Sequence, residues 1–135
     1  MTEKGTTRNP VTHVAIKVMD LDTSVAYYRD VFGYEVVNNS WHDGHYSCHL
    51  RGAGINLTLL KYDSEEAPEA LLSGTGPTIH HIGIEVDDLA ATTEKLKQAG
   101  CTILSAPGAI PVKYRAPDGT IAELIKTGTG AARAT

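Results

Sequence analysis

The chain has 135 residues, of which 41% are hydrophobic, enough for one ordinary domain with a sizeable core. Its net charge of −4 and the absence of any Lys/Arg cluster argue against nucleic-acid and membrane-surface partners and favour small ligands. Because no apolar run reaches the length of a membrane span and the polar start does not resemble a secretory signal, we expect a cytoplasmic protein.

The two ends of the chain differ from its middle. Residues 1–10 are polar and residues 127–135 are mostly small, so both segments are expected to be flexible tails around one domain at 11–126. This domain opens with a strand over 13–18, where apolar residues at every second position form one buried face. His13 lies on the other face of that strand.

A helix is expected after the first strand. Asp22 or Thr23 can cap its start, and Gly33 can end it in a left-handed conformation. Its expected apolar face consists of Val25, Tyr28 and Phe32. Short strand-like runs follow at 35–37, 46–51 and 55–62. The stretch 63–78 is rich in Glu, Pro, Gly and Ser and should be a linker with a helical turn or two around 68–72.

The second half of the domain repeats the first. His81 corresponds to His13 and Gly100 to Gly33, so strand, helix and helix stop recur in the same order. Further strands are expected at 102–104, 110–115 and 121–126. Each half therefore has the order βαβββ. The two modules span 11–62 and 79–126.

The repeat predicts a metal site. Two copies related by a pseudo-two-fold axis can present equivalent positions across a shared cleft, so His13 and His81 are candidate ligands. With the repeat offset of 67 residues that holds after Gly33, Asn56 corresponds to Glu123, and both should share this cleft. Two imidazoles and a carboxylate hold a divalent ion while leaving positions open for substrate, and Asn56 can add a neutral oxygen. The competing interpretation is that both histidines are hydrogen-bonded interior residues and Glu123 is a strand-edge charge.

A second polar group alternates along the strand predicted over 46–51. His45, Ser47 and His49 share one face of this strand, and one of its two faces should line the cleft. His45 and His49 are candidate acid/base groups, since imidazole titrates near neutral pH. The alternative is that these are polar residues on a solvated edge strand.

Other polar residues have weaker claims to the site. Tyr114 and Arg115 precede a Pro-Asp-Gly turn, where they can contact an anionic or aromatic substrate. His42 lies in a turn, and His80 should face away from His81 because neighbouring residues of a strand point to opposite faces.

Three segments carry a resemblance to a known family: HVAIKVMDLDTSVAYYRDVFGYEV, HIGIEVDDLAATTEKLKQAG and YRAPDGTIAELIK. They resemble the signature segments of the vicinal oxygen chelate superfamily, which includes glyoxalase I, methylmalonyl-CoA epimerase, extradiol dioxygenases, and fosfomycin and bleomycin resistance proteins. The resemblance implies an α+β fold in which the two βαβββ modules form a curled mixed sheet around a cleft, with helices on the outer face. It also implies metal ligands at His13, His81 and Glu123, a fourth at Asn56 in the glyoxalase and epimerase branches, and a homodimer.

The chain departs from the branches of this family at two positions. Glyoxalases usually have Glu and epimerases Gln where this chain has Asn56, whose shorter side chain weakens a four-ligand assignment. In epimerases a catalytic carboxylate stands where this chain has Ser47, so Ser47 is expected to contact substrate and His45 or His49 to replace the base. Extradiol dioxygenases need only three ligands, but most of them are two-domain proteins.

Three functions compete on the sequence alone. The preferred one is a metal-dependent glyoxalase- or epimerase-like lyase or isomerase, in which one divalent ion (Zn, Ni, Co, Mn or Fe) stabilises the enolate of a small carbonyl substrate. The alternative is a single-domain Fe(II) extradiol-type dioxygenase, whose open metal positions take a vicinal diol and oxygen. The third is a non-catalytic protein that binds an antibiotic or another aromatic ligand in the same cleft.

Overall fold

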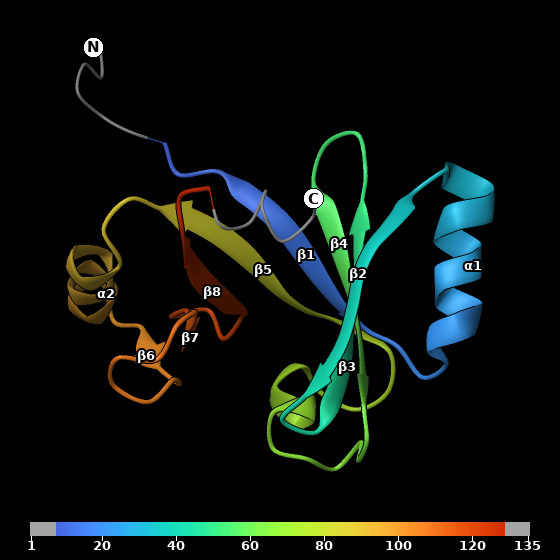
Figure 1. The fold of residues 1–135 in the computed structure, drawn as a ribbon. Helices are drawn as coiled ribbons and strands as arrows, with labels where there is room; N and C mark the ends of the chain where they lie inside the picture. Colours follow the sequence, from blue (N-terminus) through green and yellow to red (C-terminus); the bar gives the residue numbers. More distant parts are fainter. Residues whose placement is uncertain (1–7, 129–135) are drawn as a thin grey trace.

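The structure, a computed structural model, describes residues 8–128. Within these residues eight strands form one mixed sheet in the order β2-β3-β4-β1-β5-β8-β7-β6 (Figure 1). In chain order the elements are β1 (Val11–Lys17), α1 (Leu21–Phe32), β2 (Glu35–His42), β3 (His45–Arg51), β4 (Asn56–Tyr62), the 3₁₀ helix η1 (Ala70–Ser73), β5 (Thr78–Val86), α2 (Leu89–Gln98), β6 (Thr102–Ile103), β7 (Val112–Arg115) and β8 (Ile121–Lys126). The order βαβββ therefore occurs twice, as the repeat predicted, with η1 in the linker.

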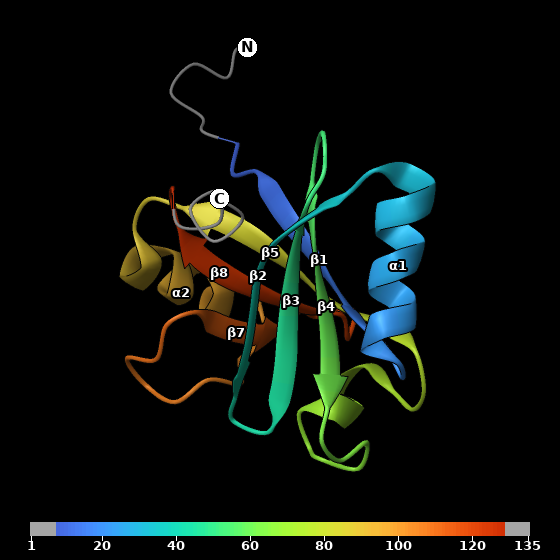
Figure 2. The same ribbon diagram turned by 45° about the vertical axis from the view of Figure 1, so that its right-hand side comes forward.

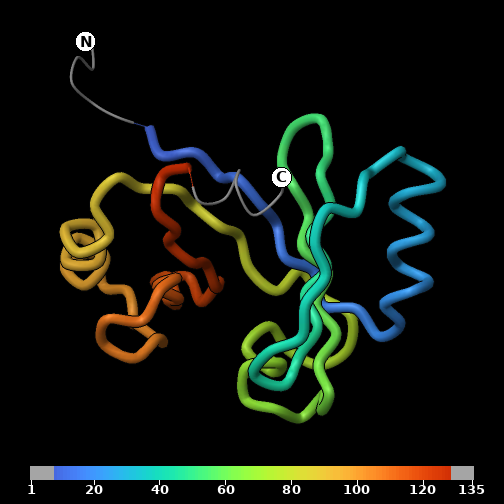
Figure 3. Tube along the Cα trace, viewed as in Figure 1, coloured from blue at the N-terminus to red at the C-terminus, as the bar shows by residue number. Residues whose placement is uncertain are grey.

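The strand order is symmetric about the middle of the sheet. β1 pairs in parallel with β4 and β5 pairs in parallel with β8, while β1 and β5 pair antiparallel with each other at the centre. In the Cα trace of Figure 3, the blue-to-green first half and the yellow-to-red second half lie on either side of these two central strands. The α+β class and the paired modules expected from the sequence are confirmed.

An aspartate caps the start of each helix. The Asp20 carboxylate accepts a hydrogen bond from the Thr23 amide at 3.1 Å, and Asp88 caps α2 in the same way at 2.9 Å. The first cap is therefore Asp20 and not the expected Asp22 or Thr23, which lie within the first turn. α1 ends as predicted at Gly33, whose φ of 77° lies in the left-handed region that favours glycine.

The two helices lie at opposite sides of the molecule, each packed on the outer face of its own half of the sheet (Figure 2). The buried residues under α1 are Val18, Cys48, Leu50 and Leu59. The buried residues under α2 are Val86, Tyr114, Ala122 and Leu124. Val25 and Tyr28 pack against the first cluster, as predicted. Phe32 was predicted to share this packed face, but it is 58% exposed and lies outside it. Because side chains alternate along each strand, the opposite face of the sheet is left to line the cleft.

β5 has an irregular register where it passes β1. Ala15 pairs with His81 but the next residue, Ile16, pairs with Ile79, so His80 is an extra residue in β5. A β-bulge of this kind re-aims side chains. Here it leaves both His80 and His81 buried, at 2% and 6% exposed. The prediction that His80 faces away from His81 is wrong because it assumed regular alternation.

The predicted tails lie mostly outside the described residues. At their described ends, the Pro10 carbonyl accepts a hydrogen bond from the Glu85 amide at 3.0 Å, and the Thr127 amide donates to the Val86 carbonyl at 2.9 Å. Both ends are thus attached to β5. Neither helix between residues 8 and 128 combines the length and the apolar character that a membrane span requires.

Candidate metal centre and cleft

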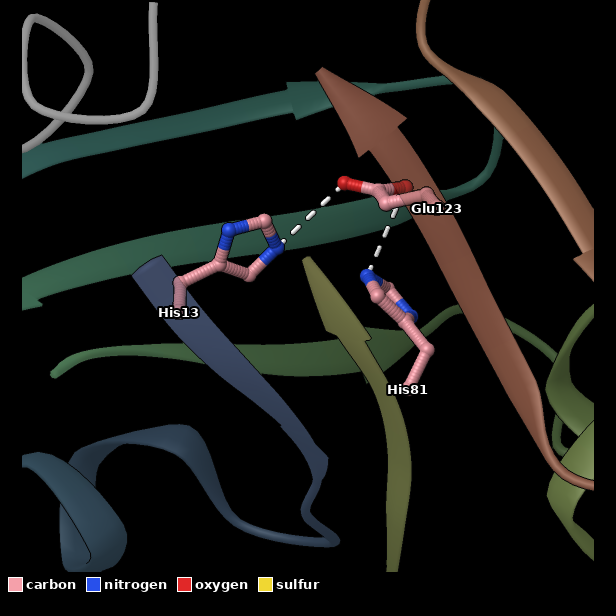
Figure 4. Close-up of side chains that lie close together, drawn as sticks. All are labelled: His13, His81 and Glu123. Carbon is pink, nitrogen blue, oxygen red and sulfur yellow. Dashed lines mark ion pairs between the residues drawn. The ribbon is translucent and has the colours of Figure 1, made fainter. Parts of the chain in front are cut away.

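Three side chains from neighbouring strands converge at the centre of the sheet. His13 comes from β1, His81 from β5 and Glu123 from β8, and their ligand atoms lie within 4.8 Å of one another (Figure 4). His13 Nε2 is 3.3 Å from Glu123 Oε1, and His81 Nε2 is 3.4 Å from the other carboxylate oxygen. All three residues are buried. The structure therefore brings together, within one chain, the three side chains that the sequence predicted as metal ligands.

Small residues on the opposing strand make room for the two imidazole rings. Gly83 pairs with His13 across β1 and β5, and a Cβ atom added to Gly83 would lie 2.0 Å from Cε1 of the His13 ring. The same pairing places Ala15 beside His81. The sequence analysis overlooked Gly83, although a small residue two positions after each histidine is a signal that the two copies share.

The donor set of the triad fits a divalent cation. Two imidazole nitrogens and a carboxylate oxygen suit zinc and the neighbouring transition metals. His13 Nε2 is buried and makes no hydrogen bond with any described residue, although it faces the Glu123 carboxylate. Burying a polar nitrogen without a hydrogen bond costs folding free energy unless some other partner binds it. The structure thus has a possible His-His-Glu metal site.

The charges around the triad favour an ionised carboxylate beside a neutral ring. Burial opposes the ionisation of Glu123, but its contacts with His13 and His81 and its attraction to Lys113 hold the pKa of its carboxyl well below the usual value. Burial lowers the pKa of His81 despite the neighbouring carboxylate. Deprotonated ligands of this kind are the forms that bind a metal.

Asn56, the predicted fourth ligand, pairs with His13 across β1 and β4 and so shares its face of the sheet. Its carboxamide oxygen accepts a hydrogen bond from the Gly52 amide at 3.3 Å. This contact turns the side chain toward the loop between β3 and β4. The role of Asn56 as a metal ligand stays a prediction.

The two halves of the sheet differ in strand register. Gly83 pairs with Glu123, whereas Ala15, the counterpart of Gly83 in the repeat, pairs with Thr58. Thr58 therefore occupies the position in the sheet that is equivalent to Glu123, although the sequence offset selects Asn56. A register difference of this kind leaves no mark in the hydrophobic pattern, because a shift by two residues keeps every side chain on its face.

A cleft of about 800 Å³ lies beside the triad. Its wall includes His81 and Glu123 and, from β3, the three alternating residues His45, Ser47 and His49. The β3 residues are 8%, 5% and 8% exposed, so they are interior side chains and not part of a solvated edge. The cleft therefore joins the possible metal site to two further histidines.

The two cleft histidines of β3 have different surroundings. His49 Nδ1 lies 3.1 Å from the hydroxyl of Thr58. Across the strands, His49 pairs with Thr58, Thr58 with Ala15, and Ala15 with His81. His45 Nδ1 is buried and has no hydrogen-bond partner among the described residues. Burial lowers the pKa of His45 below its ordinary value. A neutral His45 can accept a proton near pH 7.

His80 lies on the other side of the His81 ring. Its Nδ1 is 2.8 Å from His81 Nδ1, and its Nε2 is 2.8 Å from the carbonyl oxygen of Glu69. The Tyr62 hydroxyl lies 3.5 Å from the same Nε2. Burial lowers the pKa of His80 to about 4, so this ring is neutral at pH 7. His80 thus contacts a candidate ligand directly.

The linker segment around η1 covers part of the cleft and is held from both halves of the sheet. Glu69 forms an ion pair with Lys113 of β7. Lys17 of β1, which is 2% exposed, donates to the Ala70 carbonyl at 2.7 Å and to the Gly74 carbonyl at 2.6 Å. These contacts fix the segment whose backbone meets His80.

The fold and the triad agree with the comparison to protein families. The family model described as the Glyoxalase/Bleomycin resistance protein/Dioxygenase superfamily matches residues 11–124. The chain belongs to this superfamily. The match covers the first module, all but the last two residues of the second and all three triad residues, which confirms the resemblance found in the sequence.

Individual members of the superfamily are similar over most of the chain. An ethylmalonyl-CoA/methylmalonyl-CoA epimerase of Cereibacter sphaeroides is 34% identical over 98 residues, covering 70% of this chain and 73% of the relative. A probable lactoylglutathione lyase of Vibrio parahaemolyticus is 30% identical over 132 residues, covering 86% and 89%. The solved structure of methylmalonyl-CoA epimerase from Mycobacterium tuberculosis matches with a TM-score of 0.70 at 25% identity, covering 91% of each chain.

Within this superfamily fold, the β7 residue that reaches the cleft is Lys113, which the sequence analysis did not select. Tyr114 is 6% exposed and packs in the cluster under α2, and Arg115 donates to the Gly119 carbonyl at 2.9 Å. In the described part of the chain neither residue lines the cleft, whereas Lys113 does and pairs with Glu123. The alternation of β7 explains this for Tyr114, because Lys113 and Tyr114 point to opposite faces.

Proposed function

We propose that the chain is a metal-dependent lyase or isomerase of the glyoxalase and epimerase type, which acts on a small carbonyl substrate through an enolate. The observation that carries this proposal is the presence of two buried histidines, His45 and His49, on the same cleft wall as His81 and Glu123. Similarity to an epimerase and to lactoylglutathione lyases supports the same class of reaction.

The triad is the proposed holder of one divalent ion of zinc, nickel, cobalt, manganese or iron. When bound, this ion supplies the Lewis acidity that polarises a carbonyl and stabilises the negative charge of an enolate. His13 and His81 contribute imidazole nitrogens, and Glu123 contributes a carboxylate that is already ionised. Burial of all three residues limits competition from water.

His45 or His49 is the proposed base. Its task is to remove a proton from the carbon next to the substrate carbonyl and to return it to the product. His45 is suited to this because burial lowers its pKa and leaves it unprotonated at neutral pH. His49 is suited because it lies on the cleft wall in the same cross-strand line of residues as His81. Ser47, between them on the same face, is proposed to hydrogen bond a substrate oxygen.

Isotope exchange tests this chemistry. In D₂O the metal-loaded protein should incorporate deuterium next to a carbonyl of methylmalonyl-CoA, or it should form lactoylglutathione in a glyoxalase assay. EDTA should abolish the reaction. His45→Gln or His49→Gln should lower its rate by about 10²- to 10⁴-fold, the usual contribution of a general base, without releasing the metal. Tyr46→Phe, on the opposite face of β3, is the control.

The proposal fails if the metal-loaded protein neither exchanges a proton nor converts a small carbonyl substrate of either kind. It also fails if both histidine variants keep the wild-type rate. In the non-catalytic alternative, EDTA would leave the affinity for a bound ligand unchanged.

One observation favours a second candidate, a single-domain Fe(II) extradiol-type dioxygenase. The carboxamide of Asn56 is engaged by the Gly52 amide, and the remaining set of two histidines and a glutamate is the three-ligand set of non-haem iron oxygenases. Iron in the protein as isolated, with oxygen consumption when catechols are added, would support this candidate. Zinc, nickel or cobalt without oxygen consumption would support the first.

A homodimer is part of the proposal, as the family resemblance implies, and a cytoplasmic location is proposed with it. The triad is complete within one chain, so dimer formation is not needed to assemble it. Sedimentation at increasing protein concentration should show the dimer. Dilution to the monomer should leave the metal bound, whereas loss of metal on dilution would mean that the two chains share a site.

A further inference from the structure

A row of hydrogen bonds lies behind His81, at the ring nitrogen that does not face Glu123. It joins the carbonyl of Glu69 in the linker to His80 Nε2, and His80 Nδ1 to His81 Nδ1, with both distances 2.8 Å. His80 reaches this place because of the bulge in β5, and it is 2% exposed. The protein therefore determines which atoms carry the protons in this row.

The chemistry of the acceptor at one end fixes each proton in turn. A carbonyl oxygen can only accept, so the contact with Glu69 places a proton on His80 Nε2. A neutral imidazole has one N–H, so His80 Nδ1 then offers a lone pair. The short contact between the two Nδ1 atoms needs one proton, which must come from His81. His81 Nε2 is the nitrogen left to face the Glu123 carboxylate.

We propose that His80 is a positioning residue that fixes the ring orientation of His81 and holds a proton on its Nδ1, so that Nε2 is the atom presented to the metal. This rests on the metal site of the proposed function. Histidine ligands often donate their second N–H to a carboxylate, a carbonyl or water. Here the acceptor is a second imidazole, which a backbone carbonyl orients in turn.

The backbone at the end of the row is itself held in place. Lys17 donates to the carbonyls of Ala70, the first residue of η1, and of Gly74, which follows its last residue. Lys113 pairs with the Glu69 carboxylate from the other half of the sheet. Because both lysines immobilise the segment that carries the Glu69 carbonyl, His80 has a fixed acceptor.

Within residues 8–128, the other histidine of the triad has no equivalent row of hydrogen bonds. Thr12 precedes His13 as His80 precedes His81. The Thr12 hydroxyl is buried and has no hydrogen-bond partner among the described residues. The positioning device therefore belongs to the second module alone.

Two substitutions at position 80 separate the two hydrogen bonds. In His80→Asn the amide oxygen takes about the place of Nδ1 and still accepts from His81. In His80→Gln the amide nitrogen takes about the place of Nε2, so it donates to Glu69 but leaves His81 without an acceptor. We expect the Zn²⁺ affinity, measured by competition with a chromophoric chelator, to stay within about threefold in His80→Asn and to fall by about 10- to 100-fold in His80→Gln.

A purely structural role would lower the unfolding temperature and the Zn²⁺ affinity of both variants together. Equal losses of affinity, or a larger loss in His80→Asn, would overturn the proposal. The contrast between the two variants is therefore the readout, and not the loss in either one.

Imidazole ¹⁵N NMR of the wild-type protein tests the proton positions directly. We expect a proton on His81 Nδ1 and on His80 Nε2, both without metal and with Zn²⁺ bound. A proton on His80 Nδ1, or an unprotonated Nδ1 in His81, refutes the proposed row. A protein that binds none of the proposed divalent ions would contradict the proposed function, while the metal-free spectrum would still decide the arrangement of His80 and His81.

Discussion

The two histidines of the triad occupy equivalent positions in the repeat but are oriented in different ways. The His13 ring lies against Gly83 of the opposing strand, where a Cβ atom would come within 2.0 Å of it. His81 lies beside Ala15, and its Nδ1 contacts His80. The His13 ring is thus oriented by steric fit and the His81 ring by a hydrogen bond.

The difference shows what duplication supplies and what it leaves to single residues. Equivalent strands place His13 and His81 on the two central strands of the sheet, close enough to share a carboxylate. Their neighbours then diverge, because Thr12 stands where the second copy has His80. Both of these residues lie at irregularities of the β1 and β5 pairing. The sheet therefore sets the position of each histidine, and local neighbours set the orientation of its ring.

The largest effects should come from removing either ligand, and they should be equal for the two. We expect His13→Ala and His81→Ala each to lose the metal. The Zn²⁺ affinity should fall by more than about 100-fold, which is the largest loss usual for a residue that only supports a metal ligand. Elemental analysis after dialysis measures the loss, and catalytic activity should disappear with it. His42 lies at the end of β2 and not in the turn expected from the sequence. Its side chain is exposed, and His42→Ala should keep its metal. An active His13→Ala protein would contradict both metal-dependent enzyme proposals.

The next effect should separate the two ligands. Gly83→Ala places a methyl group where the His13 ring lies, so the ring must move, and we expect Zn²⁺ affinity to fall by about 10- to 100-fold. Gly54→Ala is the matched control, because no atom lies within 4 Å of an added Cβ there. Ala15→Gly, beside His81, adds no clash and should leave the affinity within about threefold, since His80 still orients that ring. Equal losses in Gly83→Ala and Ala15→Gly would mean that the two ligands are supported alike.

The sequence predicted the parts of this molecule that depend on periodicity. Alternating apolar residues located β1 and β5, and a glycine marked the end of α1 at Gly33. The triad followed from the repeat, because equivalent positions of two modules meet where their first strands pair. His45, Ser47 and His49 followed from alternation alone, and the structure places all three on the cleft wall.

The features that were missed depend on strand register and on local contacts. The bulge at His80 reverses the expected direction of one side chain, and no hydrophobic pattern marks an extra residue in a strand. The two-residue shift that makes Thr58 the structural counterpart of Glu123 also leaves no mark in the hydrophobic pattern, because every side chain stays on the same face of the sheet. Lys113 was not predicted because its position beside Glu123 depends on how β7 pairs with β8, which the sequence pattern does not reveal.

The difference between the halves should also appear in the pH dependence of stability. His80 has a pKa of about 4 in the folded chain and about 6.5 when unfolded, whereas Thr12 in the first half does not titrate. A lowered pKa stabilises the fold fully above pH 6.5, and this contribution is lost as the pH falls toward 4, because the unfolded chain binds the proton more tightly. We expect the metal-free protein to lose about 2 kcal/mol of unfolding free energy between about pH 7 and pH 5 through His80.

Urea unfolding of the metal-free protein at these pH values measures this loss. His45 and His81 also have lowered pKa values and act in the same direction, so the control is His80→Asn, which should reduce the pH dependence without abolishing it. Glu123 does not contribute in this range, since the stabilisation from its lowered pKa disappears only below about pH 4.5. An unchanged pH dependence in His80→Asn would show that His80 is not the group responsible.

The smallest effect should come from Lys113, a positive charge that β7 adds to the wall of the cleft. β7 contributes Lys113 beside Glu123, whereas the cleft face of β3 contributes only His45, Ser47 and His49. The Lys113 ammonium repels a divalent ion, although it also attracts Glu123 and Glu69. Lys113→Met should therefore raise the Zn²⁺ affinity by about threefold, and this gain should shrink at high salt. Lys95→Met on α2 should change nothing. A loss of affinity in Lys113→Met would mean that its ion pair with Glu69 supports the triad more than its charge opposes the metal.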